Sequence, residues 1–142
     1  MIAYFDTSAL IKLLVMEDGS DVADRVWEGA TAVVSSRLAY PEARAALADA
    51  RRADRLVSAQ LARAKLNLEI RWRQMRRIEV RPEIAVHAGD LAERHGLRGY
   101  DAVHLASALA IREVRPTVVT WDADLAVAAL AERLGVAPPI EA

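Results

Sequence analysis

The feature that most constrains the fold is a short apolar segment at the start of the chain, followed at once by an acid. Ile2–Phe5 contains apolar residues only, among them a β-branched and two aromatic side chains. Such a run is typical of a strand buried on both faces, as in parallel sheets. The run ends at Asp6, and we expect Thr7 or Ser8 to cap a following helix. Ligand sites gather at the carboxyl ends of strands in open α/β sheets, so Asp6 is a candidate site residue, with a helix cap as the alternative.

The rest of the chain repeats this alternation of short apolar runs and helical stretches. Further strands are expected at 32–34, 78–80, 117–120 and 135–140. Helices are expected at about 9–15, 20–29, 37–53, 55–77, 83–95, 100–112 and 123–134. This order predicts a single α/β domain over residues 1–142, with three α/β/α layers and a central parallel sheet of four or five strands.

Several residues mark where these helices are expected to begin or bend. Ser20 or Asp21 is expected to cap the second helix, and Asp54 the long helix predicted at 55–77. Pro41 falls in the early turns of the predicted helix 37–53 and is expected to kink or restart it near Tyr40.

Composition and charge restrict the chemistry. The chain has no cysteine, which excludes disulfides and thiolate metal sites, and only three histidines. We see no signal peptide and no apolar run of membrane-spanning length, so we expect a cytoplasmic protein that does not enter a membrane. The net charge is −1, but residues 51–81 hold ten basic and three acidic residues, a charge of +7 that leaves −8 for the remainder. A basic rim beside an acidic centre suits a polyanionic ligand.

Four acids follow predicted strands or lie in the first turns of predicted helices: Asp6, Glu42, Asp101 and Asp122. If the strands are parallel, these positions lie at one edge of the sheet, where the carboxylates can converge. One carboxylate pair at ~6 Å and a dielectric of ~20 costs about 3 kcal/mol, so the cluster needs protons, basic partners or a cation. Oxygen ligands suit Mg²⁺ or Mn²⁺, ions that polarise a phosphoryl oxygen and activate water. The implied chemistry is phosphodiester hydrolysis.

The segments that contain these acids carry a family resemblance. Residues 4–10, 36–44, 100–107 and 120–125 are similar to the motifs of PIN-domain nucleases, and the motif order most resembles the VapC toxins of toxin–antitoxin pairs. The resemblance implies an endoribonuclease dependent on Mg²⁺ or Mn²⁺, a homodimer, and inhibition by a cognate antitoxin protein. By match to the motifs, the catalytic and metal-binding acids are Asp6, Glu42, Asp101 and Asp122, with Asp124 as a candidate fifth ligand.

Several nearby residues are candidates for supporting roles. The hydroxyls of Thr7, Ser8 and Thr120 can orient a carboxylate or a metal-bound water, although capping is the expected role of Thr7 and Ser8. His104 shares a helical side with Asp101, and we expect a packed or hydrogen-bonded structural residue rather than an acid–base group. Asp124 has three open roles: a ligand, an acid behind the ligands, or a helix cap.

Two surfaces are candidates for macromolecular contacts. Arg71, Arg73, Arg76 and Arg77 are candidates for binding RNA phosphates, with a solvated helix face as the alternative. Six apolar residues of the first two helices are candidates for an antitoxin groove, with packing on the sheet as the alternative: Leu10, Leu13, Leu14, Val22, Val26 and Trp27.

Three rival functions have different signatures. A haloacid-dehalogenase-like phosphatase would use Asp6 as a nucleophile, but the second Asp of that motif is replaced here by Ser8. A non-catalytic PIN-like binding module usually lacks some of the acids, whereas all four are present. A flavodoxin-like nucleotide binder would need a Gly-rich phosphate loop after the first strand, which this chain does not have.

Overall fold

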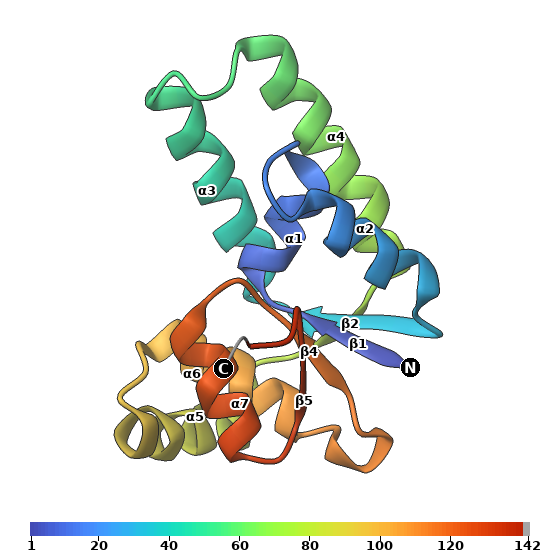
Figure 1. The fold of residues 1–142 in the computed structure, drawn as a ribbon. Helices are drawn as coiled ribbons and strands as arrows, with labels where there is room; N and C mark the ends of the chain where they lie inside the picture. Colours follow the sequence, from blue (N-terminus) through green and yellow to red (C-terminus); the bar gives the residue numbers. More distant parts are fainter. Residues whose placement is uncertain (141–142) are drawn as a thin grey trace.

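A computed structural model describes residues 1–140, in which two layers of helices enclose a five-stranded parallel sheet (Figure 1). The strand order is β3-β2-β1-β4-β5, and every neighbouring pair is parallel. This arrangement confirms the predicted three-layer α/β/α fold. The strands are β1 (Ile2–Phe5), β2 (Ala32–Ser36), β3 (Arg76–Ile78), β4 (Thr117–Val119) and β5 (Gly135–Ala137).

The first strand lies at the centre of the sheet and is buried on both faces, as its uniform apolarity predicts. Ala3 and Phe5 belong to one hydrophobic cluster, and Tyr4 between them belongs to the other. Successive side chains of a strand point to opposite faces, so β1 contributes to both clusters. All three side chains are fully buried.

Each cluster is covered by its own layer of helices (Figure 1). The helices α1 to α4 pack on the face that receives Phe5, and α5 to α7 pack on the face that receives Tyr4. The first layer contains α1 (Thr7–Leu14), α2 (Ser20–Gly29), α3 (Ala39–Arg52) and α4 (Ser58–Gln74). The second contains α5 (Pro82–His95), α6 (Gly99–Leu109) and α7 (Ala123–Ala131), with the 3₁₀ turn η1 (Arg112–Val114) after α6.

The strand order places a topological switch point between β1 and β4. From β1 the chain moves to β2 and then β3 on one side, and only later to β4 and β5 on the other. Connections on the two sides diverge at such a point, which leaves a crevice at the carboxyl ends of the two central strands. Asp6 follows β1 and its backbone N–H donates to the carbonyl of Val119 at the end of β4.

The arginine-rich middle of the chain departs from its predicted boundaries. The long helix begins at Ser58, not after Asp54, and ends at Gln74 because the chain enters β3 at Arg76. Asp54 does not cap it: this residue lies in a turn at φ 58°, and the side chain of Gln60 accepts from the backbone N–H of Val57 at the helix start. Pairing with the edge of β2 decides the position of β3, and that pairing is not visible in a local pattern.

Three predictions about helix starts were also wrong. Asp6 is the N-cap of α1, so Thr7 and Ser8 are the first residues inside the helix. Gly19, in a left-handed conformation at φ 94°, precedes α2 in place of a capping Ser20 or Asp21. Pro41 lies in the first turn of a continuous α3. Backbone N–H groups in a first turn have no acceptor within the helix, so a proline there costs no hydrogen bond.

Predicted helix and strand ends shift by a few residues elsewhere as well. The helix containing Asp101 ends at Leu109, the last helix ends at Ala131, and β4 ends one residue before Thr120. Within residues 1–140, no helix combines the length and the apolarity needed to cross a bilayer.

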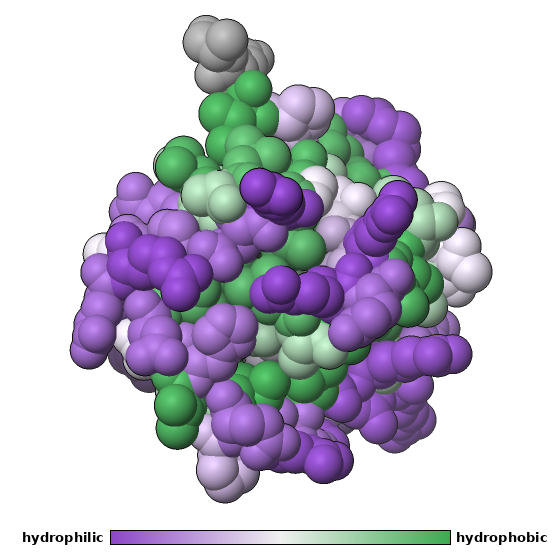
Figure 2. Space-filling view, turned by 90° about the horizontal axis from the view of Figure 1, so that it is seen from below, coloured by the Kyte–Doolittle hydropathy of each residue, from purple (hydrophilic) through white to green (hydrophobic). Residues whose placement is uncertain are grey.

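Five of the six apolar residues proposed as an antitoxin groove belong to the core of the first layer. Leu10, Leu13 and Leu14 are buried, and Val26 and Trp27 pack against the same cluster. Val22 is half-buried outside that cluster, and Leu13 and Leu14 also line a cavity of about 350 Å³. Figure 2 shows the opposite face, formed over α5 to α7, where hydrophilic side chains surround smaller apolar areas. Val86, Val127 and Leu130 are among the exposed apolar residues of these helices.

Candidate active site

All four predicted acids line one cavity of about 350 Å³ at the switch point of the sheet. They come from four separate elements: Asp6 follows β1, Glu42 lies on α3, Asp101 opens α6, and Asp122 precedes α7. Parallel pairing therefore brings together carboxylates that are up to 116 positions apart in the chain. The other lining residues are Thr7, Ser8, Ala45, Ala46, Asp49, Arg98, Tyr100 and His104.

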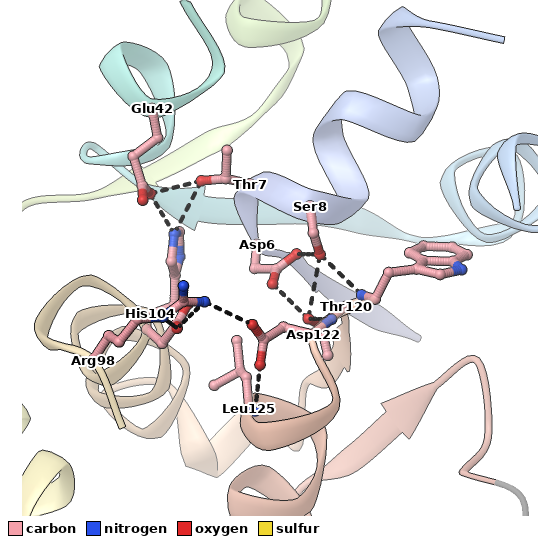
Figure 3. A network of polar contacts seen from close by, with 11 residues as sticks. Asp6, Thr7, Ser8, Glu42, Arg98, His104, Thr120, Asp122 and Leu125 are labelled. Carbon is pink, nitrogen blue, oxygen red and sulfur yellow. Dashed lines mark hydrogen bonds and ion pairs between the residues drawn. The ribbon is translucent and has the colours of Figure 1, made fainter. Parts of the chain in front are cut away.

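Asp6 is the most buried acid of the cavity, with an exposed fraction of 2%. One carboxylate oxygen accepts from the backbone N–H of Ala9 at 2.9 Å and from the hydroxyl of Ser8 at 2.7 Å. The other accepts from the hydroxyl of Thr120 (Figure 3). Burial raises the pKa of the Asp6 carboxyl even though these three donors favour its charged form.

The hydroxyls that hold Asp6 are themselves fixed by the chain leaving β4. Ser8 Oγ accepts from the backbone N–H of Trp121 at 2.9 Å, and Thr120 Oγ1 accepts from the N–H of Asp122 at 2.9 Å. Because both hydroxyls accept from backbone, their protons are directed to the Asp6 carboxylate. Ser8 and Thr120 thus orient an acid, the supporting role proposed for them, and do not cap a helix.

Asp101 and Asp122 form one wall of the cavity together with Arg98, and we call these three residues the Arg98 wall. The guanidinium of Arg98 donates at 3.1 Å to one oxygen of Asp101 and at 3.1 Å to Oδ2 of Asp122. The other oxygen of Asp122 caps α7 by accepting from the backbone N–H of Leu125 at 2.9 Å. Burial and the negative charge of Asp122 raise the pKa of Asp101, and Arg98 opposes that rise.

Glu42 lies on the opposite wall, which we call the Glu42 wall and which also contains Thr7 and His104, with the fully buried Tyr4 behind His104. Glu42 Oε1 is 2.8 Å from Nε2 of His104 and accepts from the hydroxyl of Thr7 at 2.6 Å (Figure 3). Partial burial acts to raise the pKa of Glu42, but the hydrogen bonds from His104 and Thr7 outweigh it, and the pKa is lowered.

The buried hydroxyl of Tyr4 determines how His104 meets Glu42. Burial raises the pKa of Tyr4 well above its ordinary value, so the hydroxyl keeps its proton and donates to Nδ1 of His104, 2.8 Å away. An acceptor Nδ1 places the proton of a neutral ring on Nε2, from which it points to Glu42. His104, with an exposed fraction of 2%, is therefore the hydrogen-bonded structural residue that the sequence predicts.

Several sequence candidates lie outside the cavity. Asp124 is exposed in the first turn of α7 and does not line the cavity. Arg71 stacks on Trp27 and pairs with Asp24 at 3.7 Å, which ties α4 to α2. Arg77 donates to the backbone carbonyls of Trp72 and Met75.

The last two RNA candidates, Arg73 and Arg76, are exposed near the end of α4 and in β3, away from the lining of the acidic cavity. They remain candidates for RNA contacts, whereas Arg71 and Arg77 have structural partners. The four arginines therefore differ in their structural surroundings.

Sequence reasoning missed two charged residues of the cavity lining, Arg98 and Asp49, and the buried Tyr4 behind His104. A local signal for Arg98 existed, because it lies three residues before Asp101 at the start of the same helix. No local signal pointed to Tyr4, because its partner His104 is 100 residues away in the sequence. Within residues 1–140, no three His, Asp or Glu side chains lie close enough together to form a metal site as they stand.

A comparison with protein families decides which family this fold and cavity represent. Residues 3–135 match the model of the PIN domain. The chain belongs to the PIN-domain family. Over 137 residues it is 48% identical to two curated proteins of Mycobacterium tuberculosis, named ribonuclease VapC45 and ribonuclease VapC49, with 96% of this chain and 95% of each relative covered.

Solved structures share the fold of this chain. VapC20 of Mycobacterium tuberculosis, described as a sarcin–ricin loop cleaving toxin, superposes with a TM-score of 0.70 at 21% identity, covering 90% of this chain and 95% of that one. A toxin–antitoxin complex from Klebsiella pneumoniae gives a TM-score of 0.64 at 23% identity, with 99% of both chains covered. At these identities the likeness supports the fold of this PIN domain, and its chemistry has to be argued from the cavity.

Proposed function

We propose that this chain is a divalent-metal-dependent endoribonuclease and the toxin of a type II toxin–antitoxin pair. The observation that carries the proposal is the convergence of four carboxylates on one cavity, in a PIN domain 48% identical to proteins named as ribonucleases. The carboxylates come from different elements at a switch point, which is the ordinary place for a ligand site in an open α/β sheet.

The donor set of the cavity fits Mg²⁺ or Mn²⁺. Its ligands are carboxylate oxygens, the type these ions prefer, and a cationic side chain already binds between Asp101 and Asp122. Burial raises the pKa of Asp6, and burial and the charge of Asp122 raise the pKa of Asp101. A nearby positive charge would therefore stabilise the ionised form of both carboxylates. We infer that Asp6, Asp101 and Asp122 hold the ion, with Glu42 as a further ligand. When bound, such an ion supplies a Lewis acid for the phosphoryl group and an activated water.

The chain's own residues prepare the cavity for that chemistry. Ser8 and Thr120 hold the Asp6 carboxylate by both oxygens, and His104 and Thr7 hold Glu42 at Oε1. The lowered pKa of Glu42 keeps it ionised at neutral pH, so its free oxygen can accept a hydrogen bond from the attacking water. Specificity for one RNA would come from contacts outside these carboxylates.

Partners follow from the same proposal. The Klebsiella pneumoniae neighbour is described as a toxin–antitoxin complex, which supports a cognate antitoxin for this chain, and we also propose a homodimer. Co-expression with the product of the adjacent reading frame, followed by light scattering on the purified complex, measures both. A monomer that elutes without the co-expressed protein would contradict this part of the proposal.

The catalytic proposal is tested by two matched substitutions, Asp101→Asn and Asp124→Asn. Asp101 lines the cavity, whereas Asp124 is exposed in the first turn of a neighbouring helix outside it. With total bacterial RNA and Mn²⁺, we expect the parent and Asp124→Asn to cleave, and Asp101→Asn to lose activity by about a hundredfold or more. EDTA should stop cleavage in every protein. A parent that binds RNA but never cleaves it would favour the non-catalytic module.

Metal binding has a second readout that does not depend on cleavage. An ion that binds only the folded protein stabilises it by about 2.7 kcal/mol at a hundredfold excess over its dissociation constant. We expect Mn²⁺ to raise the melting temperature of the parent and of Asp124→Asn, and to raise that of Asp101→Asn less. Without metal, Asp101→Asn should melt no lower than the parent, because removing this charge relieves repulsion from Asp122. An unchanged response to Mn²⁺ in Asp101→Asn would remove Asp101 from the metal site.

A further inference from the structure

Among the residues that line the acidic cavity, Arg98 is the only Arg or Lys, and it sits on the carboxylates proposed to bind metal. Asp122 has two oxygens, and one of them caps α7 through the backbone N–H of Leu125. The other oxygen, Oδ2, accepts a hydrogen bond from Arg98, which also donates to an oxygen of Asp101. An ion that uses Oδ2 of Asp122 therefore has to share or displace this guanidinium.

The position of Arg98 allows such an exchange without unpacking the core. The side chain of Arg98 is 64% exposed, compared with 10% for Asp101 and 22% for Asp122, so the guanidinium approaches from the solvent side. Its charged end also lies 4.8 Å from the ring centre of the exposed Tyr100 at the rim of the cavity. A cation stacked on an aromatic face has a second favourable contact, which gives Arg98 support after it leaves the acids.

A freed guanidinium at this rim would face an approaching phosphate. Arginine binds phosphate oxygens in a planar two-pronged geometry, and an RNA backbone that reaches the carboxylates has to pass the cavity mouth. We propose that Arg98 is an internal counter-cation of the cavity, which the divalent ion displaces and which then binds the scissile phosphate of RNA. This inference rests on the proposed function and assigns Arg98 two successive partners in it.

The charges of the cavity support this exchange. With Arg98 on Asp101 and Asp122, the guanidinium offsets part of the repulsion between two carboxylates that share one wall. A divalent ion there would offset more of it and leave the guanidinium free as a second positive group. Positive groups placed at the phosphoryl oxygens stabilise the charge of the transition state.

The test compares Arg98→Gln with Arg94→Gln in two separate measurements. Arg94 is the matched control, because it is an exposed arginine in an ion pair with Glu132, away from the cavity. In calorimetric titration with Mn²⁺ and no RNA, we expect Arg98→Gln to bind the ion about three to ten times more tightly than the parent, since a competing exposed ion pair is gone. Arg94→Gln should bind Mn²⁺ as the parent does.

The second measurement is RNA cleavage at saturating Mn²⁺, where the metal affinity no longer matters. We expect Arg98→Gln to cleave about a hundredfold more slowly than the parent, in the range for loss of one transition-state donor. Arg98→Lys keeps the charge but loses the two-pronged geometry, and we expect it to cleave at a rate between the two. Unfolding curves without metal confirm that each variant is folded.

The outcomes separate this inference from the proposed function. If Arg98→Gln binds Mn²⁺ no more tightly than the parent, Arg98 is not a competitor of the ion. If it binds more tightly but cleaves as fast as the parent, the phosphate role is wrong. If the parent itself binds Mn²⁺ and cleaves no RNA, the proposed function fails, while the titration still measures whether Arg98 competes with the ion.

Discussion

The two walls of the acidic cavity hold their carboxylates in different ways. On the Glu42 wall, the partners of Glu42 are a buried imidazole and a hydroxyl, and Tyr4 fixes the imidazole from behind. These donors hold one oxygen of the carboxylate from within the protein and leave the other free to meet a ligand. The Glu42 wall is therefore already built before any ligand arrives.

On the Arg98 wall, two carboxylates share one exposed guanidinium that lies at the cavity mouth. This cation occupies the position that a ligand would need. The comparison shows that carboxylates of one cavity can be held by buried hydrogen-bond donors or by an exposed cation. In our proposal the buried donors stay in place when a divalent ion binds, and the exposed cation leaves. Three predictions test this difference between the walls, and a fourth concerns the arginines outside the cavity.

The largest difference is expected in stability. His104→Ala removes a buried ring together with the hydrogen-bond partner of Tyr4, and it leaves Glu42 with Thr7 alone. We therefore expect it to lower the free energy of unfolding by about 3 kcal/mol. Arg98→Ala removes an exposed side chain that offsets part of the repulsion between Asp101 and Asp122, and it should lower the free energy of unfolding much less than His104→Ala does. Urea unfolding of both variants at neutral pH measures the contrast. Equal losses would mean that the two walls are equally part of the core.

A smaller effect is expected from Tyr4→Phe, which removes one hydroxyl and no bulk. We expect the free energy of unfolding to fall by about 1 kcal/mol, because one buried hydrogen bond is lost. We expect the cleavage rate to fall about tenfold, because Tyr4 no longer keeps the proton of His104 on Nε2, the nitrogen that faces Glu42. The matched control is Tyr40→Phe, whose hydroxyl binds Glu69 outside the cavity. It should lose stability without losing activity. Equal rates in both variants would show that Tyr4 acts through packing alone.

The pH dependence of stability without metal should differ in sign between the walls. The pKa of Asp101 is raised in the folded state, so its ionisation costs stability as pH rises through that pKa, and acidification recovers the loss. The pKa of Glu42 is lowered, so it contributes stability above its ordinary pKa and loses it as pH falls through the lowered value.

Unfolding free energies between about pH 3 and pH 8 measure this difference directly. Relative to the parent, Asp101→Asn should gain stability toward neutral pH, and Glu42→Gln should lose it over the same range. Curves that shift in the same direction for both variants would contradict the assigned pKa directions.

The smallest effect concerns the arginines outside the cavity. If Arg73 and Arg76 bind RNA, the double variant with Gln at both positions should flatten the slope of log affinity against log salt by about 0.7 for each phosphate that is no longer neutralised. Fluorescence anisotropy with a labelled RNA at several salt concentrations measures the slope. An unchanged slope would assign both residues to a solvated surface and leave Arg98 as the main candidate for phosphate binding.

Local sequence determined the elements and the placement of the acids within them. The uniform apolarity of Ile2–Phe5 predicted a strand buried on both faces, because such a segment has no polar side to turn to water. The change from apolar run to acid placed Asp6 and Asp122 just after strands. The predicted end of the helix at 83–95 matches the end of α5, which Gly96 caps in a left-handed conformation. These signals depend on neighbours within a few residues, so the sequence carries them directly.

Only the tertiary structure decided what each acid meets. Thr120 reaches Asp6 across 114 positions, His104 reaches Tyr4 across 100, and Arg98 reaches Asp122 across 24. These contacts follow from the strand order and from the packing of α6 and α7 beside β1. The contact of Arg98 with Asp101 is local in the sequence. Glu42 meets a buried imidazole and Asp122 meets an exposed guanidinium, and the sequence does not distinguish the two cases, because both contacts join segments that only the fold brings together.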